Sequence, residues 1–409
     1  MLLFICKKKE RKKCKELRLI TDFFEFTENL VKGACLLASG GGGSYSSAKR
    51  LLDAYRTFPQ SKKKAPLEVL KPKEAVPGGY AVVLAFLGSP EALENAGEKP
   101  INAAIAVVEE QIRLLEQREQ VLSYLVPVEL GAVNSLIPCI VAHHFGLAVI
   151  DGDGAGRAIP TLEVSSFSAE KDLSLVPCVF EDHNHHSVTL NSKNDEHCSV
   201  AIAEQLARPV VSTDTFGGYA GLALWPMSHE QLCRAVKITG SLSRAAALGH
   251  FLNSEATASV TDMLAFVNAN HADNDSYKVE GQLLFSGQLV AASTSTGGGF
   301  DYGSVVIEGK TDRFTGLFQN ETLLCWSSGS DSPLAMAPDS IAYFVEDTTQ
   351  VYSNEDLVDG NTGQIYEQLV GVRCHVIRFT AQPSMMCKPV VDEFGKILNR
   401  MGYYGRLKV

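Results

Sequence analysis

The strongest fold signal lies in residues 126–163, which read VPVELGAVNSLIPCIVAHHFGLAVIDGDGAGRAIPTLE. An apolar, strand-like run comes first and stops at Glu129. A short helix is predicted next, with Asn134 or Ser135 as its N-cap, because a side-chain oxygen there can accept a hydrogen bond from a first-turn amide. Apolar residues then recur at helical spacing as far as Gly146, and glycine commonly follows the end of a helix.

The helix leads into a second apolar run, residues 147–150, which reads as a buried strand and delivers Asp151 and Asp153 at its end. A strand–helix–strand crossover favours parallel pairing of the two strands. Parallel pairing puts Glu129 and Asp151 on the same edge of the sheet, where open α/β sheets bind their ligands. We therefore predict the active site at this edge, with Arg157 on the glycine-rich turn that follows.

The two halves of this region resemble a known family. ELGAVNSLIP at residues 129–138, followed by VIDGDGAGRAIP at residues 149–160, resembles the S-methyl thiohydantoin desulfurase family. Its members show a Glu–Gly–Asn segment before the helix and an Asp-x-Asp-Gly-x-Gly-Arg-Ala-Phe-Pro-Glu-Leu run after it. This chain departs from the run in three places: Ile159 replaces Phe, and Thr161 and Glu163 stand where Glu and Gln are usual.

The resemblance covers about residues 25–380 and implies a function. It implies a hydrolase that acts on a small five-membered imide ring and releases methanethiol from S-methyl thiohydantoins. Genes of the family lie beside, or are fused to, hydantoinase/oxoprolinase genes. The alternative is therefore a non-catalytic or accessory subunit that partners a hydantoinase/oxoprolinase-type protein. An intact acidic crevice would favour the enzyme, and a large exposed apolar patch beside a collapsed crevice would favour the subunit.

The acidic residues at the predicted sheet edge suit such chemistry. Glu129, Asp151 and Asp153 can provide a general base or hold a divalent metal such as zinc, while Arg157 can clamp an anion or a polarised carbonyl. Carboxylates crowded at a buried edge repel one another unless a cation or a proton intervenes. A Lewis-acidic metal that activates water would serve the displacement of methanethiol, with Asp151 and Asp153 as candidate ligands. No GxSxG or HExxH motif supports a serine-hydrolase or zincin alternative.

A loop of four consecutive glycines, residues 40–43, joins a helix predicted from about Thr21 to a second helix that opens near Ser44. Glycine amides at a helix N-terminus can bind an anion or a polarised carbonyl, because no side chain blocks the approach. The loop is not a Walker A motif, since no Gly-Lys-Ser/Thr follows it. A tight interhelical turn is the structural alternative, but the loop is a hallmark of the resembled family. We assign these residues to substrate binding: Gly41, Gly42, Gly43 and Asn134.

Composition narrows the class of protein. A chain of 409 residues is long enough for two or three domains. Its net charge of −10 argues against nucleic acid as a partner, and no apolar run reaches the length of a membrane helix. The ten cysteines stand singly without a CxxC pair, as expected of reduced thiols in a cytoplasmic protein. Assembly into a homo-oligomer is left open.

The spacing of apolar residues changes along the chain and divides it into regions of different predicted structure. We predict that residues 1–20 form a disordered basic extension and residues 21–254 an α/β domain with a mainly parallel sheet. Within that domain, residues 60–79 read as a surface connection and residues 228–250 as one long helix. From about Val279 the period becomes alternating, so residues 255–409 are predicted to form a β-rich domain, sandwich-like or barrel-like.

Two further groups of polar residues invite alternative interpretations. His183, His185 and His186 lie in a polar hairpin, and His197 follows closely in the sequence. Such a group of histidines can bind zinc, but we favour the interpretation that it is a solvated loop. The pairs at residues 320–321 (Asn-Glu) and 338–339 (Pro-Asp) stand at the ends of predicted strands and recur in the resembled family. We attribute these pairs to turn chemistry.

Overall fold

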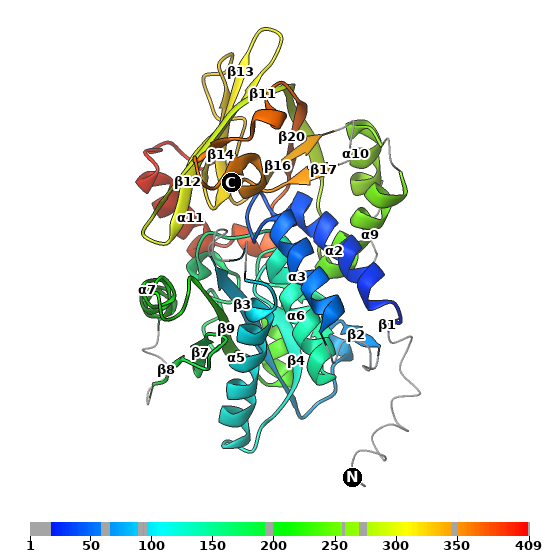
Figure 1. Ribbon diagram of the computed structural model, residues 1–409, viewed down its shortest axis with the longest axis vertical. Helices are drawn as coiled ribbons and strands as arrows, with labels where there is room; N and C mark the ends of the chain where they lie inside the picture. Colours follow the sequence, from blue (N-terminus) through cyan, green and yellow to red (C-terminus); the bar gives the residue numbers. More distant parts are fainter. Residues whose placement is uncertain are drawn as a thin grey trace.

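The computed structural model describes residues 18–58, 66–88, 93, 96–192, 199–255, 258–269, 276–345 and 350–407. It contains a mixed α/β sheet in the lower half of Figure 1 and an antiparallel sheet in the upper half. No helix among the described residues is long and apolar enough to cross a bilayer.

The mixed sheet has eight strands, of which the second to the fifth in sheet order are mutually parallel. In sheet order its strands are β1 (Arg18–Ile20), β2 (Leu67–Leu70), β5 (Ala148–Ile150), β4 (Val121–Pro127), β3 (Gly79–Gly88), β9 (Tyr219–Met227), β7 (Cys178–Glu181) and β8 (Ser187–Leu190). The parallel pairing of β4 with β5 across helix α6 (Ala132–Phe145) confirms the predicted crossover. Antiparallel strands complete the sheet on both sides.

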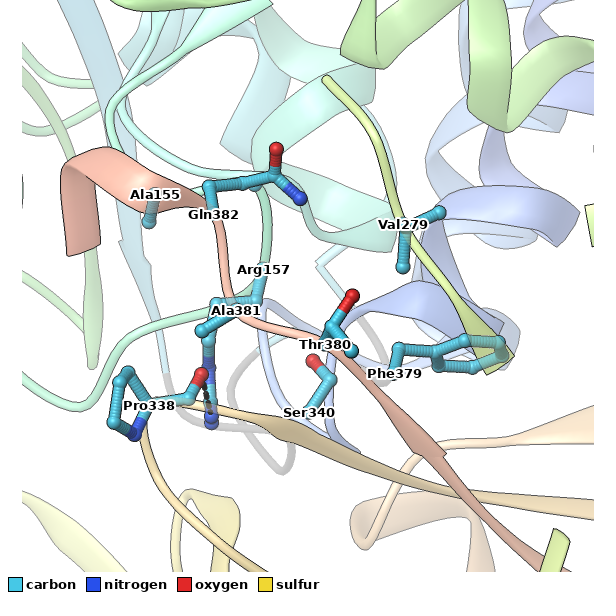
Figure 2. A pocket seen from close by; sticks show the side chains of 10 residues that line it. Ala155, Arg157, Val279, Pro338, Ser340, Phe379, Thr380, Ala381 and Gln382 are labelled. Atoms are coloured by element: carbon cyan, nitrogen blue, oxygen red, sulfur yellow. Dashed lines mark hydrogen bonds between the residues drawn. The ribbon is translucent and has the colours of Figure 1, made fainter. Parts of the chain in front are cut away.

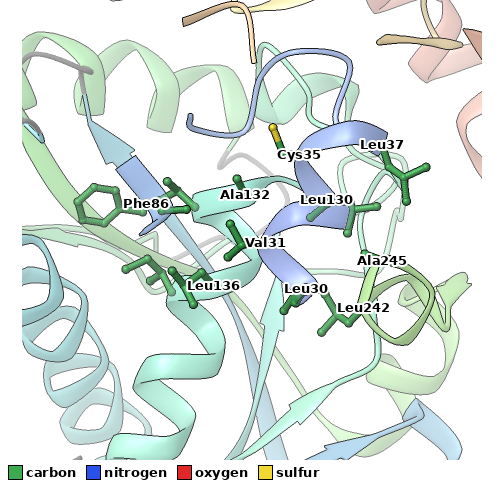
Figure 3. Packing of buried hydrophobic residues seen from close by; sticks show 14 of the residues in the cluster. Leu30, Val31, Cys35, Leu37, Phe86, Leu130, Ala132, Leu136, Leu242 and Ala245 are labelled. Atoms are coloured by element: carbon green, nitrogen blue, oxygen red, sulfur yellow. The ribbon is translucent and has the colours of Figure 1, made fainter. Parts of the chain in front are cut away.

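Helices cover both faces of this sheet. The remaining helices are α2 (Phe23–Leu37), α3 (Tyr45–Thr57), α5 (Lys99–Glu116), α7 (Val200–Val211), α8 (His229–Ala235), α9 (Ser241–Ser254), α10 (Val260–Ala269) and α11 (Lys388–Arg400), with 3-10 turns η3 (Pro72–Glu74), η4 (Leu162–Val164), η7 (Glu355–Leu357), η8 (Glu367–Leu369) and η9 (Pro383–Met386). Alternate residues of β3 point to opposite sides: Val82 and Leu84 join one buried cluster, and Ala81 and Val83 join another. The first cluster includes α2, α6 and α9, which lie together in Figure 3.

Helices α2 and α9 pack with unusually close backbones. A Cβ placed on Gly33 would lie 1.9 Å from the carbonyl oxygen of Ala245, and one placed on Gly249 would lie 1.8 Å from that of Asn29. Glycine is therefore required at both positions, because any side chain would push the helices apart.

Helix α6 begins earlier than predicted. Its N-cap is Gly131, so the prediction of Asn134 or Ser135 as the cap is wrong. The first-turn amides of Val133 and Asn134 instead donate to the carbonyl oxygen of Gly42, over 3.0 and 3.4 Å, so a distant loop supplies the cap. The predicted end of the helix is confirmed: the residue after its last turn, at position 146, is a left-handed glycine.

The prediction that residues 60–79 form only a surface connection is wrong. The proposed surface connection at residues 60–79 contains β2, which pairs with β1 and β5 and buries Leu67, Val69 and Leu70. Residues 1–17 and 59–65 lie outside the described part, whereas residues 18–20, assigned to the extension, form β1. Neighbouring lysines and prolines hid β2, since this strand is only four residues long and one of them is Glu68.

The predicted long helix at residues 228–250 is interrupted. Helix α8 ends at Ala235, a short strand β10 (Ile238–Thr239) follows, and α9 starts after Gly240, which has φ +90°. Strand β10 pairs with β6 (Gly152–Asp153), directly after β5. The interruption brings the start of α9 to the sheet edge that carries Asp151.

The upper half is an open antiparallel sheet. In sheet order its strands are β15 (Ala335–Met336), β14 (Glu321–Ser327), β13 (Arg313–Gln319), β12 (Phe300–Glu308), β11 (Gly281–Gly297), β20 (Arg373–Phe379), β16 (Ser340–Val345) and β17 (Gln350–Tyr352), with β18 (Val358–Asp359) and β19 (Gln364–Ile365) beside β11. Its β-rich character confirms the prediction. The described residues form no closed barrel, because the outer strands β15 and β17 do not pair with each other, and the sandwich-like or barrel-like detail of the prediction is not confirmed. The domain boundary at residue 254 stays a prediction.

Candidate active site

The glycine loop lies at the junction of the two halves. Ser39 exchanges two hydrogen bonds with Thr322 of β14: its hydroxyl donates to the Thr322 carbonyl at 2.8 Å, and its carbonyl accepts from the Thr322 amide at 2.7 Å. The carbonyl of Gly40 accepts from the amide of Asn354 at 2.8 Å. The loop is therefore buried under the β-rich half and is not an exposed turn between helices.

The N-terminus of α3 already holds an anion. The carboxylate of Asp356 accepts from the backbone amides of Tyr45 and Ser46 at 2.9 and 3.2 Å. A helix N-terminus favours negative charge, and here the side chain of Asp356 already occupies that position. Substrate binding by the loop therefore has to use the residues before α3.

Close packing explains glycine at position 42. Gly42 has φ +71°, and a Cβ there would lie 2.6 Å from the Cα of Gly131 and 3.4 Å from Oε1 of Glu129. The loop is thus pressed against the start of α6 and against the Glu129 carboxyl. Gly43 also has positive φ, +82°, and a Cβ there would meet the side chain of Val133 at 2.4 Å.

Glu129 follows β4 and is 4% exposed. Its Oε1 accepts from the Asn134 side-chain amide at 2.6 Å, and its Oε2 accepts from the backbone amide of Ile159 at 2.6 Å. Asn134 is itself held by the amide of Phe86 at the end of β3, which donates to its Oδ1 at 2.8 Å. Burial raises the pKa of Glu129 to about 7, against the lowering effect of the two donors. This carboxyl can therefore exchange a proton near neutral pH.

Asp151 and Asp153 also reach the sheet edge, but their carboxyl groups contact the protein. Asp151 accepts from the backbone amide and the hydroxyl of Ser243, at 3.0 and 2.5 Å, in the first turn of α9. Asp153 Oδ1 accepts from the amides of Ala155 and Gly156 at 2.7 and 2.6 Å, which shapes the turn. Burial raises the pKa of Asp153 to about 6.

These contacts do not suit a divalent metal. Both oxygens of Asp151 and one of Asp153 already accept hydrogen bonds from the protein. Divalent metals in proteins need several free oxygen, nitrogen or sulfur ligands that converge on one point. Across the described ranges, no group of three or more His, Cys, Asp or Glu residues is placed to hold a metal ion.

The histidine hairpin is not assembled as a metal site either. His185 and His186 contact Glu181 and Asp182 respectively, at 3.0 and 2.8 Å. His183 contacts the hydroxyl of Tyr219 at 3.0 Å, and His197 lies outside the described residues. Each described ring thus has its own partner.

Arg157 links the two halves. Its Nε donates to the carbonyl of Ala158 at 2.7 Å, and its Nη1 donates to the carbonyls of Pro338 and Asp339 at 3.1 and 2.5 Å. The Nη2 atom is buried and makes no hydrogen bond. Burial lowers the pKa of the guanidinium to about 10, so it stays charged at neutral pH. Figure 2 shows Arg157 beside a water-sized cavity of about 10 Å³ that Pro338 and Gln382 also line.

Glu321 is the site residue whose place the sequence analysis did not recognise, because the pair at residues 320–321 was attributed to turn chemistry. It begins β14, is 2% exposed, and lies against Gly41, where an added Cβ would be 2.0 Å from its Oε1. Its Oε2 is buried and makes no hydrogen bond. Burial first, and then the charge of Glu129, raise the pKa of Glu321 well above its usual range, while Arg157 opposes the shift. The signals in the sequence were an acid at the start of a mostly apolar strand and the recurrence of the pair at residues 320–321 in the resembled family.

Comparison with known protein families identifies the family of this chain. A family model described as S-Me-THD-like, N-terminal domain, matches residues 25–192, and one described as S-Me-THD-like, C-terminal domain, matches residues 198–395. The chain belongs to the S-Me-THD-like family. This confirms the resemblance to S-methyl thiohydantoin desulfurases that was drawn from the sequence.

A crystal structure of a protein from Chromobacterium violaceum is similar to this S-Me-THD-like chain. The two are 32% identical, superpose with a TM-score of 0.81, and the match covers 94% of this chain and 98% of the other. None of the curated proteins matches. The similarity thus extends over both halves and the junction between them.

The structure gathers some of the predicted residues and separates others. Glu129, Asn134 and Gly42 meet on one side of the loop. On the other side Gly41 contacts Glu321, which interacts electrostatically with Arg157. The carboxyl groups of Asp151 and Asp153 instead contact the start of α9 and the turn after β6, respectively. Of the departures from the family run, position 161 is buried, while Glu163 is partly exposed near Glu393 of α11.

Proposed function

We propose that this S-Me-THD-like protein is a hydrolase of small five-membered imide rings that releases methanethiol from S-methyl thiohydantoins, with Glu129 as the general base. The setting of the Glu129 carboxyl carries the proposal. It is buried at the carboxyl edge of parallel strands, two donors fix its orientation, and its pKa of about 7 suits proton transfer at neutral pH.

The neighbouring residues fit that role. A ligand that reaches the glycine loop meets the Glu129 carboxyl, because the Gly42 Cβ position is 3.4 Å from its Oε1. Arg157 supplies a buried positive charge for a polarised ring oxygen. Asn134 is a positioning residue, because it holds Glu129 and is held by β3. Asp153 shapes the turn that carries Arg157, whereas Asp151 holds the start of α9.

A ring substrate needs the site to open. The cavity beside Arg157 holds about one water molecule, at about 10 Å³. The hydrogen bonds from Arg157 to the carbonyls of Pro338 and Asp339 cross the junction, so a local opening beside Arg157 has to break them. Opening and closing of this kind excludes water from many active sites during reaction.

The closed site also favours the second candidate function. An accessory subunit that binds a hydantoinase/oxoprolinase-type protein needs no open crevice. Against it, the exposed large apolar side chains are spread over several elements, including β1, β4, α7 and β11. A pull-down with purified hydantoinase/oxoprolinase-type protein tests this candidate: a stable complex, together with no turnover by the chain alone, would favour it.

Methanethiol detection tests the enzyme. Purified protein is incubated with a panel of S-methyl thiohydantoins, before and after treatment with a chelator, and its metal content is measured. We expect methanethiol and the corresponding hydantoin in equal amounts, with activity retained after chelation, because the carboxylates at 151 and 153 are occupied by protein donors. Loss of activity on chelation and recovery on adding zinc would contradict the metal-free mechanism.

A further inference from the structure

Two buried polar atoms at the junction have no partner. Glu321 Oε2 and Arg157 Nη2 make no hydrogen bond, and both side chains are 2% exposed. The two groups interact electrostatically. Buried polar groups are nearly always hydrogen-bonded, and exceptions often belong to functional sites. A ligand that supplies an acceptor for Arg157 and a partner for Glu321 would satisfy both.

The backbone fixes Glu321 on both sides. The amide of Asn320 donates to the carbonyl of Asp301 at 2.7 Å, and the amide of Thr322 donates to the carbonyl of Ser39 at 2.7 Å. Because Gly41 has no side chain, the carboxyl of Glu321 occupies the space where a Cβ would lie. The carboxyl is therefore held in place before any ligand arrives.

The hydrogen-bond donors around the two glutamates favour different protonation states for them. Two like acids in one buried site do not ionise together, so one of them keeps its proton. The amides of Asn134 and Ile159 donate to Glu129 and stabilise its anion. No donor reaches Oε2 of Glu321. Glu129 therefore ionises first, and Glu321 retains the proton.

We propose that Glu321 is the general acid of the reaction proposed above, a catalytic residue that protonates the substrate ring nitrogen while Glu129 deprotonates the attacking water. This inference rests on the proposed function and adds to it the class of substrate bond: a ring C=N whose carbon carries the S-methyl group. Arg157 Nη2 is then available to a carbonyl oxygen of the same ring.

Over the proposed reaction each of the two glutamates gives one proton and takes one. Water attacks the ring carbon, a C–O bond forms, and the C=N electron pair moves to nitrogen, which takes the proton of Glu321 while Glu129 takes one from water. In the collapse, Glu321 takes the proton of the new hydroxyl group as C=O forms. The C–S bond breaks with its electron pair on sulfur, and Glu129 returns its proton to sulfur as methanethiol. Both carboxyl groups end as they began.

The test compares four proteins by methanethiol release across pH: the wild type, Glu321→Gln, Gly41→Ala and Gly395→Ala. Glu321→Gln keeps the shape of the protonated acid, so we expect an unchanged or raised melting temperature and a rate at least about 10²-fold lower. Its remaining activity should lack the fall at high pH that the wild type shows when Glu321 ionises.

In Gly41→Ala the new Cβ displaces the Glu321 carboxyl without changing charge, so the rate falls likewise. Gly395→Ala in α11 has room for its Cβ and keeps full activity.

A folded Glu321→Gln protein with wild-type rate and pH profile would overturn the inference and leave the proposed function intact. An unfolded Glu321→Gln protein would also overturn it, because a neutral carboxyl without a partner on Oε2 should tolerate the amide. If the wild type releases no methanethiol from any ring in the panel, the proposed function itself fails, and the inference with it.

Discussion

Glu129 and Asp151 end neighbouring parallel strands, yet their surroundings give them different chemistry. Glu129 contacts a side-chain amide and a backbone amide beside the glycine loop, whereas Asp151 contacts Ser243 at the start of α9. The sequence was enough to place both acids on one edge, because a crossover fixes strand direction. It could not identify Ser243 as a partner, since that depends on the interruption at Gly240.

The raised pKa of Glu129 predicts how stability depends on pH. The folded protein holds this proton up to about pH 7, while the unfolded chain releases it near the ordinary glutamate value. The neutral carboxyl thus contributes stability below that ordinary value, and the contribution is lost as pH rises through about 7. Gln cannot ionise, so the melting temperature of Glu129→Gln relative to wild type should rise between pH 5 and pH 8.

Thermal melts at the two pH values check this. Glu116→Gln, at an exposed position, is the matched control and should show no such change. A difference between Glu129→Gln and wild type that stays constant with pH would show that Glu129 is ionised throughout.

At the scale of elements, the start of α9 depends on a side chain from another element. Its N-cap is Gly240, which offers no side-chain oxygen, and the carboxylate of Asp151 accepts from the amide of Ser243 in its place. Likewise, the carbonyl of Gly42 accepts from the first-turn amides of α6. Such long-range caps are invisible to local sequence patterns, which is why the start of α6 was placed too late and the start of α9 was missed.

This arrangement predicts that Asp151→Asn destabilises the protein by about 1–3 kcal/mol, because one hydrogen bond to Ser243 is lost or reversed. Ser243→Ala should cost less, since the backbone bond remains, and the double variant should show coupling between the two positions. Urea unfolding measures all three. Unchanged stability with a rate at least about 10²-fold lower would instead support the catalytic role predicted for Asp151 from the sequence.

At the scale of the whole molecule, the two halves are interleaved. Strand β9 lies within the family's C-terminal match, at residues 198–395, but it sits in the mixed sheet between β3 and β7. One apolar cluster includes Leu30 of α2 together with Phe344 and Phe379 of the β-rich half. The change of sequence period revealed the two sheets, but it did not reveal how tightly the glycine loop joins them.

Fragments test this interleaving. Residues 18–192 lack β9 and leave the edges of β3 and β7 unpaired, so we expect no cooperative thermal transition and a tendency to aggregate. Residues 18–254 keep the complete mixed sheet and should melt cooperatively, at a lower temperature than the full chain. Circular dichroism of both fragments checks the prediction. A cooperative transition of the shorter fragment would show that β9 is dispensable.

The proposed role of Glu129 as general base is tested most directly by methanethiol release from wild type and Glu129→Gln between pH 5 and pH 9. We expect the wild-type rate to rise with pH through about 7, where the carboxyl ionises, and to fall again at the higher pH at which Glu321 ionises. We also expect Glu129→Gln, still folded by its melting temperature, to be at least about 10²-fold slower at the pH of the highest wild-type rate. A folded Glu129→Gln protein with the wild-type rate would contradict the claim.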